Sequence, residues 1–463
     1  MVEFSRRAFF SLKFKSNLMK LFSSNHLSDP NGTLKRVTTR PAAILRYVAE
    51  LAGSRPFPSI RFAQTFSAFR HRNYRLWFVG QLISLVGTWT QTTAQGYLVF
   101  ELTHSPVYLG YVGFAAGVPS WLFMLYGGVI ADRIPRRRLL VFTQTAMMIL
   151  ALGLAALTFL RLVQPWHIMV LALGLGIANA FDAPARQSFV LEMVDRDDLP
   201  NAIALNSSMF NLATVVGPAI GGVVYALVGP AWCFTFNGLT FLGVIAALLL
   251  MRIKPLAARA NNNAALADLR EGLRYVAANP AIRTLIAVVA MISLFGMAYM
   301  TLIPAWAVTV LGGNETTNGW LQSARGLGAL GGAMMIAMLG RINFKGKLLT
   351  TGLFVFPGML LVFATMRWLP FSLLALVGVG WGFMILFNMA NTLIQTLVSD
   401  ELRGRVVSVY TLSFFGLAPL GALLAGWAAE TIGEPLTIIL SALISLAFAA
   451  FLWVRVPHLR RLN

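Results

Sequence analysis

From Asn73 onward, the chain alternates between long apolar segments and short polar connections. An α-helix needs about 20 predominantly apolar residues to cross the hydrocarbon core of a bilayer, and each apolar segment has close to this length or more. The pattern therefore predicts an all-α membrane protein with twelve transmembrane helices, at residues 74–100, 107–131, 139–160, 166–190, 202–228, 231–251, 284–311, 317–339, 348–366, 370–394, 406–428 and 435–454.

The longest polar connection between these segments, residues 252–283, separates two predicted six-helix bundles, residues 73–251 and 284–456. Its pattern predicts a short amphipathic helix, with an apolar face formed by Leu266, Leu269, Leu273 and Val276. We interpret this connection as a cytoplasmic linker between the bundles.

The two bundles resemble distant, pseudo-symmetric copies of each other. Pro218 in the fifth segment has a counterpart in Pro419 of the eleventh, and an acidic pair follows both the fourth and the tenth segments. Many secondary transporters are built from two such halves around a central site, and they expose this site alternately to the two sides of the membrane.

The composition excludes a water-soluble globule, because 57% of the residues are hydrophobic, 12% are charged and the mean hydropathy is +0.71. The predicted helices leave no room for a separate catalytic domain, so we expect the protein not to be an enzyme. Cys233 is the single cysteine and the five histidines are scattered, so the sequence predicts no disulfide within the chain, no metal site and no cofactor.

The formal net charge of +20 would suggest a nucleic-acid partner in a soluble protein, but its placement here predicts orientation instead. Sixteen Lys and Arg residues lie in the even-numbered connections, whereas the odd-numbered ones contain only Arg161 and Arg367. Because basic loops remain on the cytoplasmic side, both termini are expected in the cytoplasm.

Residues 1–72 form a basic leader with 13 Lys or Arg and three acidic residues. Lys13 and Lys15 interrupt its candidate apolar core, so it does not fit a secretory signal. We interpret the leader as a flexible cytoplasmic tail that lies against anionic membrane lipids. A transit-like segment and a start codon assigned too far upstream are the alternatives. Residues 457–463 are expected to form a second, short cytoplasmic tail.

The connection after the second predicted helix combines a glycine, an acid and several arginines. Gly128 would let neighbouring helices pack closely, and Asp132 would interact with the positive N-terminal end of another helix. Arg133 and Arg136 would hold the loop on the cytoplasmic side and bridge to acids across the bundle. A simple positive-inside turn is the alternative interpretation.

This stretch, residues 128–138, resembles the characteristic loop motif of the major facilitator superfamily, with Pro135 where that family usually has glycine. Further stretches are similar to a branch of drug:proton antiporter-type efflux proteins that contains the bacterial enterobactin exporter, namely residues 87–91, 101–106, 182–187 and 403–405. The resemblance implies the major facilitator fold and a place in the cell inner membrane. It also implies that the loop motif is a conformational latch of the outward-facing state, formed by Gly128, Asp132, Arg133, Arg136 and Arg186.

A second motif lies in the fifth segment, where Gly217, Pro218 and Gly221 predict a helix bend. Proline removes a backbone hydrogen bond, and glycine allows close helix contact. The stretch is similar to the core of the motif associated with antiporters in this superfamily, which implies export, although Ser208 and Ala213 stand where that motif has upstream glycines. Ordinary helix packing is the alternative.

Several polar residues in the apolar segments are candidates for substrate binding. Thr88, Gln91, Thr92 and Gln95 are spaced i, i+3, i+4, i+7 and form one polar stripe, which should face water or substrate. Asn211, Asn388 and Asn391 are further candidates, although hydrogen bonds between helices would also explain them.

Ionisable residues inside a membrane are costly and mark candidate functional sites. Asp182 and Arg186 lie four residues apart on the fourth helix and can neutralise each other. Proton coupling by Asp182 and an ion-pair network with Arg136 both remain open. Arg325, in the eighth segment, has no acid nearby in sequence, so it either snorkels to the outer surface or faces the cavity and attracts an anionic substrate.

Together these features predict a monomeric secondary transporter that exports a small amphipathic compound, drug-like or siderophore-like, by alternating access. Proton antiport follows from the resemblance. Scarce acids and Arg325 favour a neutral or anionic substrate. A metabolite uptake permease or facilitator is the main alternative. A polytopic membrane enzyme or a lipid-handling protein is disfavoured, because the sequence lacks clustered His, Asp or Ser residues at the membrane interface.

Overall fold

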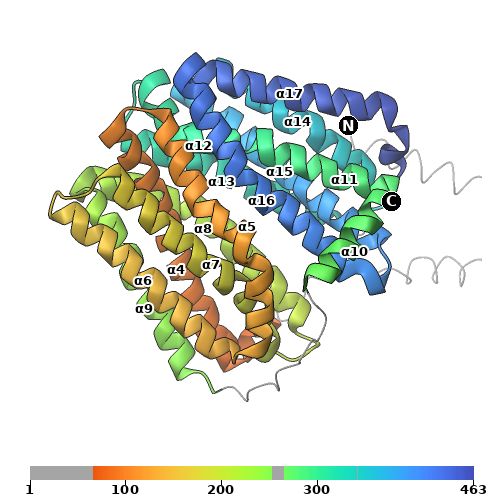
Figure 1. Ribbon diagram of the computed structural model, residues 1–463, viewed down its shortest axis with the longest axis horizontal. Coiled ribbons are helices and arrows are strands. Elements are labelled where there is room, and N and C mark those ends of the chain that lie inside the picture. Colours follow the sequence, from red (N-terminus) through yellow and green to blue (C-terminus); the bar gives the residue numbers. More distant parts are fainter. Residues whose placement is uncertain (1–65, 253–264, 341, 463) are drawn as a thin grey trace, which may run out of the picture. The chain divides into compact units, whose positions relative to one another are not determined.

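The computed structural model describes residues 66–252, 265–340 and 342–462, with the backbone alone for residues 124, 125, 129, 131, 132 and 265–268. Every regular element in these ranges is helical. The first half contains α4 (Arg72–Thr103), α5 (Pro106–Arg133), α6 (Arg136–Phe159), α7 (Pro165–Phe189), α8 (Leu199–Val228) and α9 (Pro230–Leu250). After α10 (Ala265–Ala278), the second half contains α11 (Pro280–Met291), α12 (Ala298–Ala305), α13 (Glu315–Leu339), α14 (Lys345–Thr365), α15 (Leu369–Leu397), α16 (Asp400–Ile432) and α17 (Glu434–Arg455) (Figure 1).

Nine helical segments of the described residues are long and apolar enough to cross a membrane. They are α6, α8, α9, α14, α15, α16, α17 and the longer segments Pro165–Glu192 and Pro280–Val310. The chain is therefore a multi-pass helical membrane protein. α4, α5 and α13 also coincide with predicted segments but are not among the nine. In α4 and α13, buried polar side chains such as Gln81 and Asn318 make the helix less apolar.

The segment predicted as one helix over residues 284–311 is not a continuous α-helix. α11 passes into a π-helical turn at Ile292–Gly296, and a second such turn, Trp306–Val310, follows α12. Such π turns within α-helices are frequent at functional sites. Pro304 of α12 faces Gly96 of α4, where an added Cβ would lie 3.2 Å from the proline ring. Hydrophobic periodicity does not distinguish an α-turn from a π-turn, so the sequence did not indicate this interruption.

Each half has apolar cores of its own. One large cluster of buried side chains comes from residues 276–459, and three smaller clusters come from residues 68–251, with Ala305 as the one addition. Between the halves, α5 packs against α16 and α8 against α13 (Figure 1). Pro218 and Pro419 lie at these two crossings, where their partners are Gly319 and Gly117. The prolines that the sequence repeat paired therefore occupy corresponding places in the fold.

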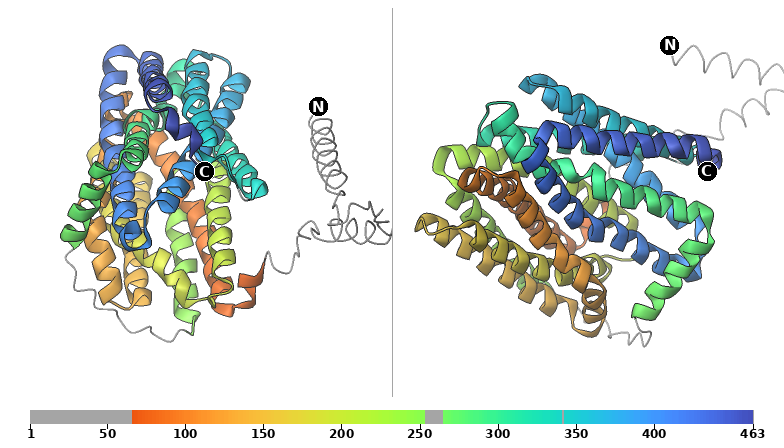
Figure 2. Two further views of the ribbon diagram at one scale, coloured as in Figure 1. Left: turned by 90° about the vertical axis from the view of Figure 1, so that its right-hand side faces the viewer. Right: turned by 45° about the horizontal axis from the view of Figure 1, so that its top comes forward.

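The predicted amphipathic helix of the linker is α10, and it packs beside the start of α16 (Figure 2). Val276 is buried and Leu269 packs partly against the core of the second half, as expected of an apolar face. Leu273 departs from the prediction because it is exposed, and the Leu266 side chain lies outside the described residues. Most of the basic leader, residues 1–65, also lies outside them.

Candidate functional site

A row of buried polar side chains joins α4 of the first half to α13 of the second. Asn318 donates from Nδ2 to the Thr93 carbonyl (3.2 Å), and Gln322 donates from Nε2 to Asn318 Oδ1 (3.1 Å). The Thr93 hydroxyl donates to Gln322 Oε1 (3.4 Å). We call these three residues the α4–α13 seam. Because buried polar groups need partners, this seam holds the two halves together at a defined register.

Arg325 lies one helical turn beyond Gln322 on α13 and is 7% exposed. Its guanidinium carbon lies 5.7 Å from the centre of the Trp89 ring of α4, so the side chain points to the other half of the molecule. Its Nε and Nη2 atoms have no hydrogen-bond partner among the described residues. The ion pairs of the described residues involve other arginines and none joins a carboxylate to Arg325.

The side chains of the predicted polar stripe of α4 find hydrogen-bond partners partly within α4 and partly on α9. The Thr88 and Thr92 hydroxyls donate to carbonyls four residues earlier, those of Ser84 (2.9 Å) and Thr88 (2.8 Å). Gln91 is buried and accepts a 2.7 Å hydrogen bond from Asn237 of α9. Thr92 is exposed and Gln95 is half-buried. Thr92 and Gln95 are therefore the more accessible members of the stripe, whereas Gln91 is bonded to Asn237 within the first half.

The three asparagine candidates form their hydrogen bonds within their own helices. Asn211 donates to the Ser207 carbonyl (2.9 Å) and Asn388 donates to the Met384 carbonyl (3.0 Å). Asn391 accepts from Gln395 (3.0 Å). None of these three hydrogen bonds joins two helices. The contacts therefore do not support the alternative that the asparagines serve to link helices.

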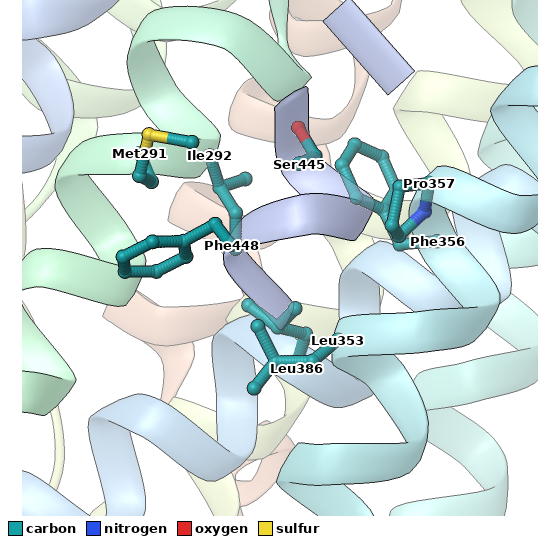
Figure 3. Close-up of a pocket in the computed structure, with 8 residues that line it drawn as sticks. All are labelled: Met291, Ile292, Leu353, Phe356, Pro357, Leu386, Ser445 and Phe448. Carbon is teal, nitrogen blue, oxygen red and sulfur yellow. The ribbon is translucent and has the colours of Figure 1, made fainter. Parts of the chain in front are cut away.

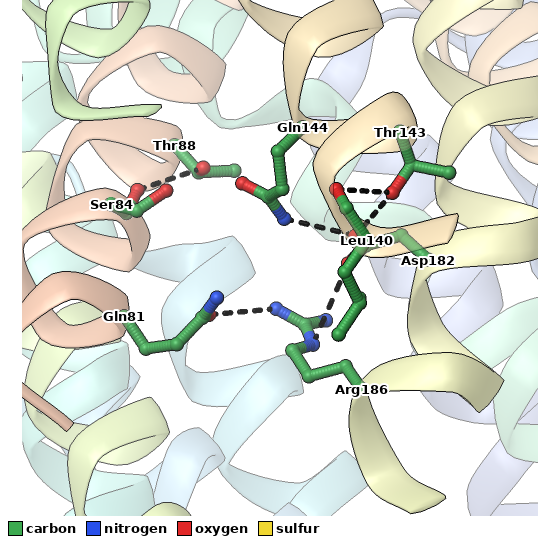
Figure 4. Close-up of polar contacts among 8 residues, drawn as sticks. All are labelled: Gln81, Ser84, Thr88, Leu140, Thr143, Gln144, Asp182 and Arg186. Carbon is green, nitrogen blue, oxygen red and sulfur yellow. Dashed lines mark hydrogen bonds and ion pairs between the residues drawn. The ribbon is translucent and has the colours of Figure 1, made fainter. Parts of the chain in front are cut away.

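Asp182 of α7 is fully buried at the centre of a polar cluster (Figure 4). Its Oδ1 accepts from the Thr143 hydroxyl (2.8 Å) and from Gln144 Nε2 (2.9 Å), both on α6. Its Oδ2 lies 3.7 Å from Arg186 Nε and accepts no hydrogen bond. Arg186 also donates to Gln81 of α4 (3.4 Å). The cluster thus links three helices of the first half around one carboxylate.

The arginines of the loop motif at the start of α6 have partners outside the Asp182 cluster. Arg136, at the start of α6, donates to Glu192 at 2.8 Å, immediately after α7. Arg137 donates to the Leu249 carbonyl at the C-terminal end of α9, where a cation is favourable. Arg133 is exposed, and the Asp132 side chain lies outside the described residues. The ion pairs of Arg136 and Arg186 that the structure describes are therefore two separate pairs.

Gly128 makes no close helix contact in this conformation, so its expected packing role stays a prediction. An added Cβ at Gly128 would meet nothing within 4 Å, whereas one at Gly127 would collide with the Ala180 carbonyl of α7. Successive residues of an α-helix point about 100° apart, so a shift of one position moves the close contact to a different face. Gly127, together with Gly176 of α7, thus lets α5 and α7 approach each other.

The motif in the fifth predicted segment lies in an uninterrupted helix, α8, that contacts both halves. An added Cβ at Gly221 would meet the Thr90 carbonyl of α4, and one at Gly217 would meet Trp89. Gly222 faces Gly319 of α13. The Thr90 hydroxyl donates to the Gly217 carbonyl (3.0 Å). The small residues therefore create a close contact surface, and whether they also bend the helix stays a prediction.

Contacts between the halves gather at the ends of the helices near residues 104–105 and 433. Glu430 of α16 accepts from the Ser105 hydroxyl (2.6 Å), and Trp427 donates to the Tyr111 hydroxyl (3.4 Å). These side-chain contacts join α5 to α16 at one end of the two helices.

A small cavity of about 10 Å³ lies within the second half, between the π turn after α11 and helices α14, α15 and α17 (Figure 3). Ser445 contributes the one hydroxyl of its lining, which is otherwise apolar. A volume of this size accommodates about one water molecule. The cavity is therefore too small to be the site of an amphipathic substrate.

Sequence reasoning missed several residues of these clusters, namely Gln81, Thr93, Thr143, Gln144, Asn237, Asn318 and Gln322. A signal existed on α13, where Asn318, Gln322 and Arg325 are spaced i, i+4, i+7 and form a polar stripe like that of α4. The partners of Asp182 lie 38 and 39 residues away on another helix, and no local pattern indicated them.

Comparison with known proteins gives matches over most of the chain. The family described as transmembrane secretion effector matches residues 63–463. The chain is 29% identical to the multidrug efflux pump Tap of Mycolicibacterium fortuitum, over 79% of this chain and 91% of that protein. It is 26% identical to the enterobactin exporter EntS of Salmonella choleraesuis, over 81% and 89%. It is 24% identical to the staphyloferrin A transporter of Staphylococcus aureus, over 78% and 90%.

Solved transporter structures have a similar fold. The nucleoside transporter NupG superposes with a TM-score of 0.66 at 14% identity and covers 82% of this chain and 98% of its own. A bacterial homologue of the human lysosomal transporter Spinster gives a TM-score of 0.63 at 15% identity, over 82% and 95%. At these identities the likeness concerns the fold alone.

Proposed function

This chain belongs to the transmembrane secretion effector family of major facilitator efflux transporters, and on that premise we propose that it exports a small amphipathic compound across the inner membrane by alternating access. It is a transporter and not an enzyme. The observation that carries the proposal is the α4–α13 seam with Arg325 beside it, because this polar row lies between the two halves. A drug-like or siderophore-like cargo agrees with the names of the relatives.

In this proposal α4, α5 and α13 also cross the membrane and bring the number of spans to twelve. Their polar residues face other helices and not lipid, as the buried Gln81, Thr93 and Asn318 illustrate. Polar residues inside a membrane protein are tolerated where they face the bundle interior. The basic connections, including the arginines at the start of α6, support a cytoplasmic location of both termini.

With that orientation, the Ser105–Glu430 and Tyr111–Trp427 contacts lie at the outer end. The halves would separate at the cytoplasmic end when the exporter takes up its cargo. Thr92, Gln95 and Arg325 contribute to the binding surface, with Asn211, Asn388 and Asn391 as further candidates. Export follows when the outer contacts separate and the cytoplasmic ends approach each other.

Asp182 is the proposed site of proton coupling. A proton that enters from outside would bind the carboxylate and cancel its attraction to Arg186, 3.7 Å away. Arg186 and Gln81 of α4 would then be free to rearrange, which couples protonation to the position of α4. Loss of the proton to the cytoplasm restores the pair and completes the cycle.

Transport into inside-out vesicles tests the proposal. With an acidic interior, vesicles that contain the protein should accumulate a drug-like dye or a siderophore such as enterobactin, and collapse of the pH gradient should stop this accumulation. Movement that is independent of the gradient would contradict proton antiport. Accumulation of the same compounds by intact cells would instead assign an uptake function.

The substitution Asp182→Asn tests the coupling residue. It should abolish gradient-driven transport at normal protein levels, because the amide cannot bind and release a proton. The exposed Asp197→Asn is the matched control and should transport as the unmodified protein does. Unchanged transport by Asp182→Asn would assign the carboxylate a purely structural role.

A further inference from the structure

We propose that the cargo carries a carboxylate group, and that the edge of Arg325 formed by Nε and Nη2 binds it while Trp89 packs against the apolar body of the cargo. This inference rests on the proposed function, because it names the chemical class of the compound that the exporter would carry. It concerns a site on α13 and α4 that is separate from the Asp182 cluster.

Arg325 carries a permanent positive charge in a buried position. The guanidinium is always protonated in proteins, and the residue is 7% exposed. A buried charge without a partner is strongly unfavourable. The face of Trp89 attracts the cation but does not occupy its N–H groups. Among the described residues, Nε and Nη2 of this buried cation thus have no hydrogen-bond partner. Two such donors between the halves of the molecule indicate a ligand.

The two atoms without a partner identify the kind of ligand. Nε and Nη2 lie on the same edge of the planar guanidinium, and their N–H bonds point in parallel. A carboxylate presents two oxygens at a matching separation and forms two hydrogen bonds with such an edge. A neutral carbonyl or hydroxyl group would satisfy one of the two N–H groups. The edge therefore favours a planar anion with two oxygens.

The backbone around Arg325 is fixed by close helix contacts, which positions the side chain before any ligand binds. The Arg325 carbonyl lies against Gly380 of α15, and Gly326 lies against the Thr214 carbonyl of α8. Trp89 is held in turn against Gly217 of α8. Rigid placement of a cation and an aromatic ring lowers the entropy cost of binding. The pair thus forms a site with a charged part and an apolar part.

The depth of Arg325 agrees with a transport site. It lies ten residues after Glu315, the first residue of α13, which corresponds to about 15 Å along the helix axis. This is close to half of the hydrocarbon thickness of about 30 Å. The edge has no contact with solvent in this conformation, so entry of a carboxylate requires the α4–α13 seam to loosen. Binding and separation of the halves would therefore be coupled.

Arg367 provides a contrast within the same half. Its guanidinium lies 5.4 Å from the centre of the Trp306 ring, as Arg325 lies over Trp89. However, Arg367 Nη1 donates to the Ala364 and Met366 carbonyls, each at 3.0 Å. Arg367 is also exposed, so water reaches its remaining N–H groups. Arg325 is buried with Nε and Nη2 unpartnered among the described residues, and this difference supports a role in binding.

Binding of two matched probes to the purified full-length protein tests the proposal. The probes are 2-naphthoate and its neutral amide, 2-naphthamide, and the readouts are thermal stabilisation and quenching of tryptophan fluorescence. The unmodified protein should bind the carboxylate about tenfold more tightly or better, because a charged hydrogen-bonded pair contributes more than a neutral one. Equal affinity for the two probes, or no binding of the carboxylate, would overturn the proposal.

Three substitutions locate the effect. Arg325→Gln should remove the preference for the carboxylate, and Arg367→Gln, the matched control, should retain it. If Arg325→Gln does not fold, Arg325→Lys decides instead: it should keep the preference with reduced affinity, because an ammonium group is a point charge without the parallel edge. A full preference in Arg325→Gln, or unchanged affinity in Arg325→Lys, would contradict the assignment.

The outcome also separates this inference from the proposed function. Carboxylate binding that depends on Arg325 without any vesicle transport would contradict export and leave the site in place. Gradient-driven transport of neutral and anionic compounds alike, with equal probe affinities, would contradict the carboxylate site and leave export in place.

Discussion

Two buried ionisable side chains of the described residues differ in how their surroundings satisfy them. Asp182 receives hydrogen bonds from Thr143 and Gln144 and lies beside Arg186. Arg325 has the Trp89 ring nearby but leaves Nε and Nη2 without partners. Buried N–H groups without partners destabilise the folded protein. We therefore interpret the unpaired edge of Arg325 as a functional feature.

The first prediction concerns the stability that the protein loses by burying the unpaired charge of Arg325. Without cargo, Arg325→Gln should be at least as stable as the unmodified protein, because the substitution removes an unpaired buried charge, and the gain should be about 1 kcal/mol or more. Thermal unfolding in detergent measures it. A marked loss of stability would indicate that Arg325 has a partner that satisfies its charge.

A second prediction at this scale concerns pH. Hydrogen bonds from Ser67 and His71 hold the pKa of Asp198, just before α8, below its usual value, with a smaller contribution from the His71 charge. A carboxyl group with a lowered pKa stabilises the fold above the unfolded pKa of about 3.9, and this contribution is lost as the pH falls through the folded value. Unfolding temperatures should therefore fall below about pH 4 in the unmodified protein.

Asp198→Asn should make this acid-induced decrease smaller, since the amide does not titrate. The exposed Asp197→Asn serves as the control and should follow the unmodified protein. Identical pH profiles for Asp198→Asn and the unmodified protein would show that the contact with His71, 2.8 Å long, does not contribute to stability.

At the scale of elements, the fold depends on helices that approach closely through small residues. Gly222 of α8 faces α13, where an added Cβ would lie 2.9 Å from the Glu315 carbonyl oxygen and 3.1 Å from Thr316 Cα. These neighbours are backbone atoms, which cannot move aside as a flexible side chain does. The α8–α13 crossing is therefore sensitive to side-chain size.

Gly222→Val should accordingly destabilise the conformation in which the outer ends meet, by about 1–3 kcal/mol, as expected for overpacking. Gly153→Ala in α6 is the control, because an added Cβ there meets nothing within 4 Å. Its stability should be unchanged or slightly higher, since alanine favours helix. Equal unfolding temperatures for Gly222→Val and the unmodified protein would contradict the close packing.

At the scale of the whole molecule, the sequence predicted what local patterns determine. The lengths of the apolar segments predicted the bounds of the helices to within a few residues. The largest difference is at α16, which begins at Asp400 and not near residue 406. The ion pair of Asp182 with Arg186 could be predicted from the sequence, because the two residues are four positions apart on one helix. The contact of Arg136 with Glu192 and that of Gln91 with Asn237 join different helices, and only the tertiary arrangement specifies them.

In the proposed transport cycle, the two halves alternate between contact at the outer ends and contact at the cytoplasmic ends. Distances between paired spin labels in a Cys233→Ala background measure this change, with one pair at Tyr126 and Met338 near the cytoplasmic ends and another at Tyr108 and Trp320 near the outer ends. Acidification outside, with cargo inside, should shorten the first distance while the second lengthens. Distances that stay constant, or that change in the same direction at both ends, would contradict alternating access.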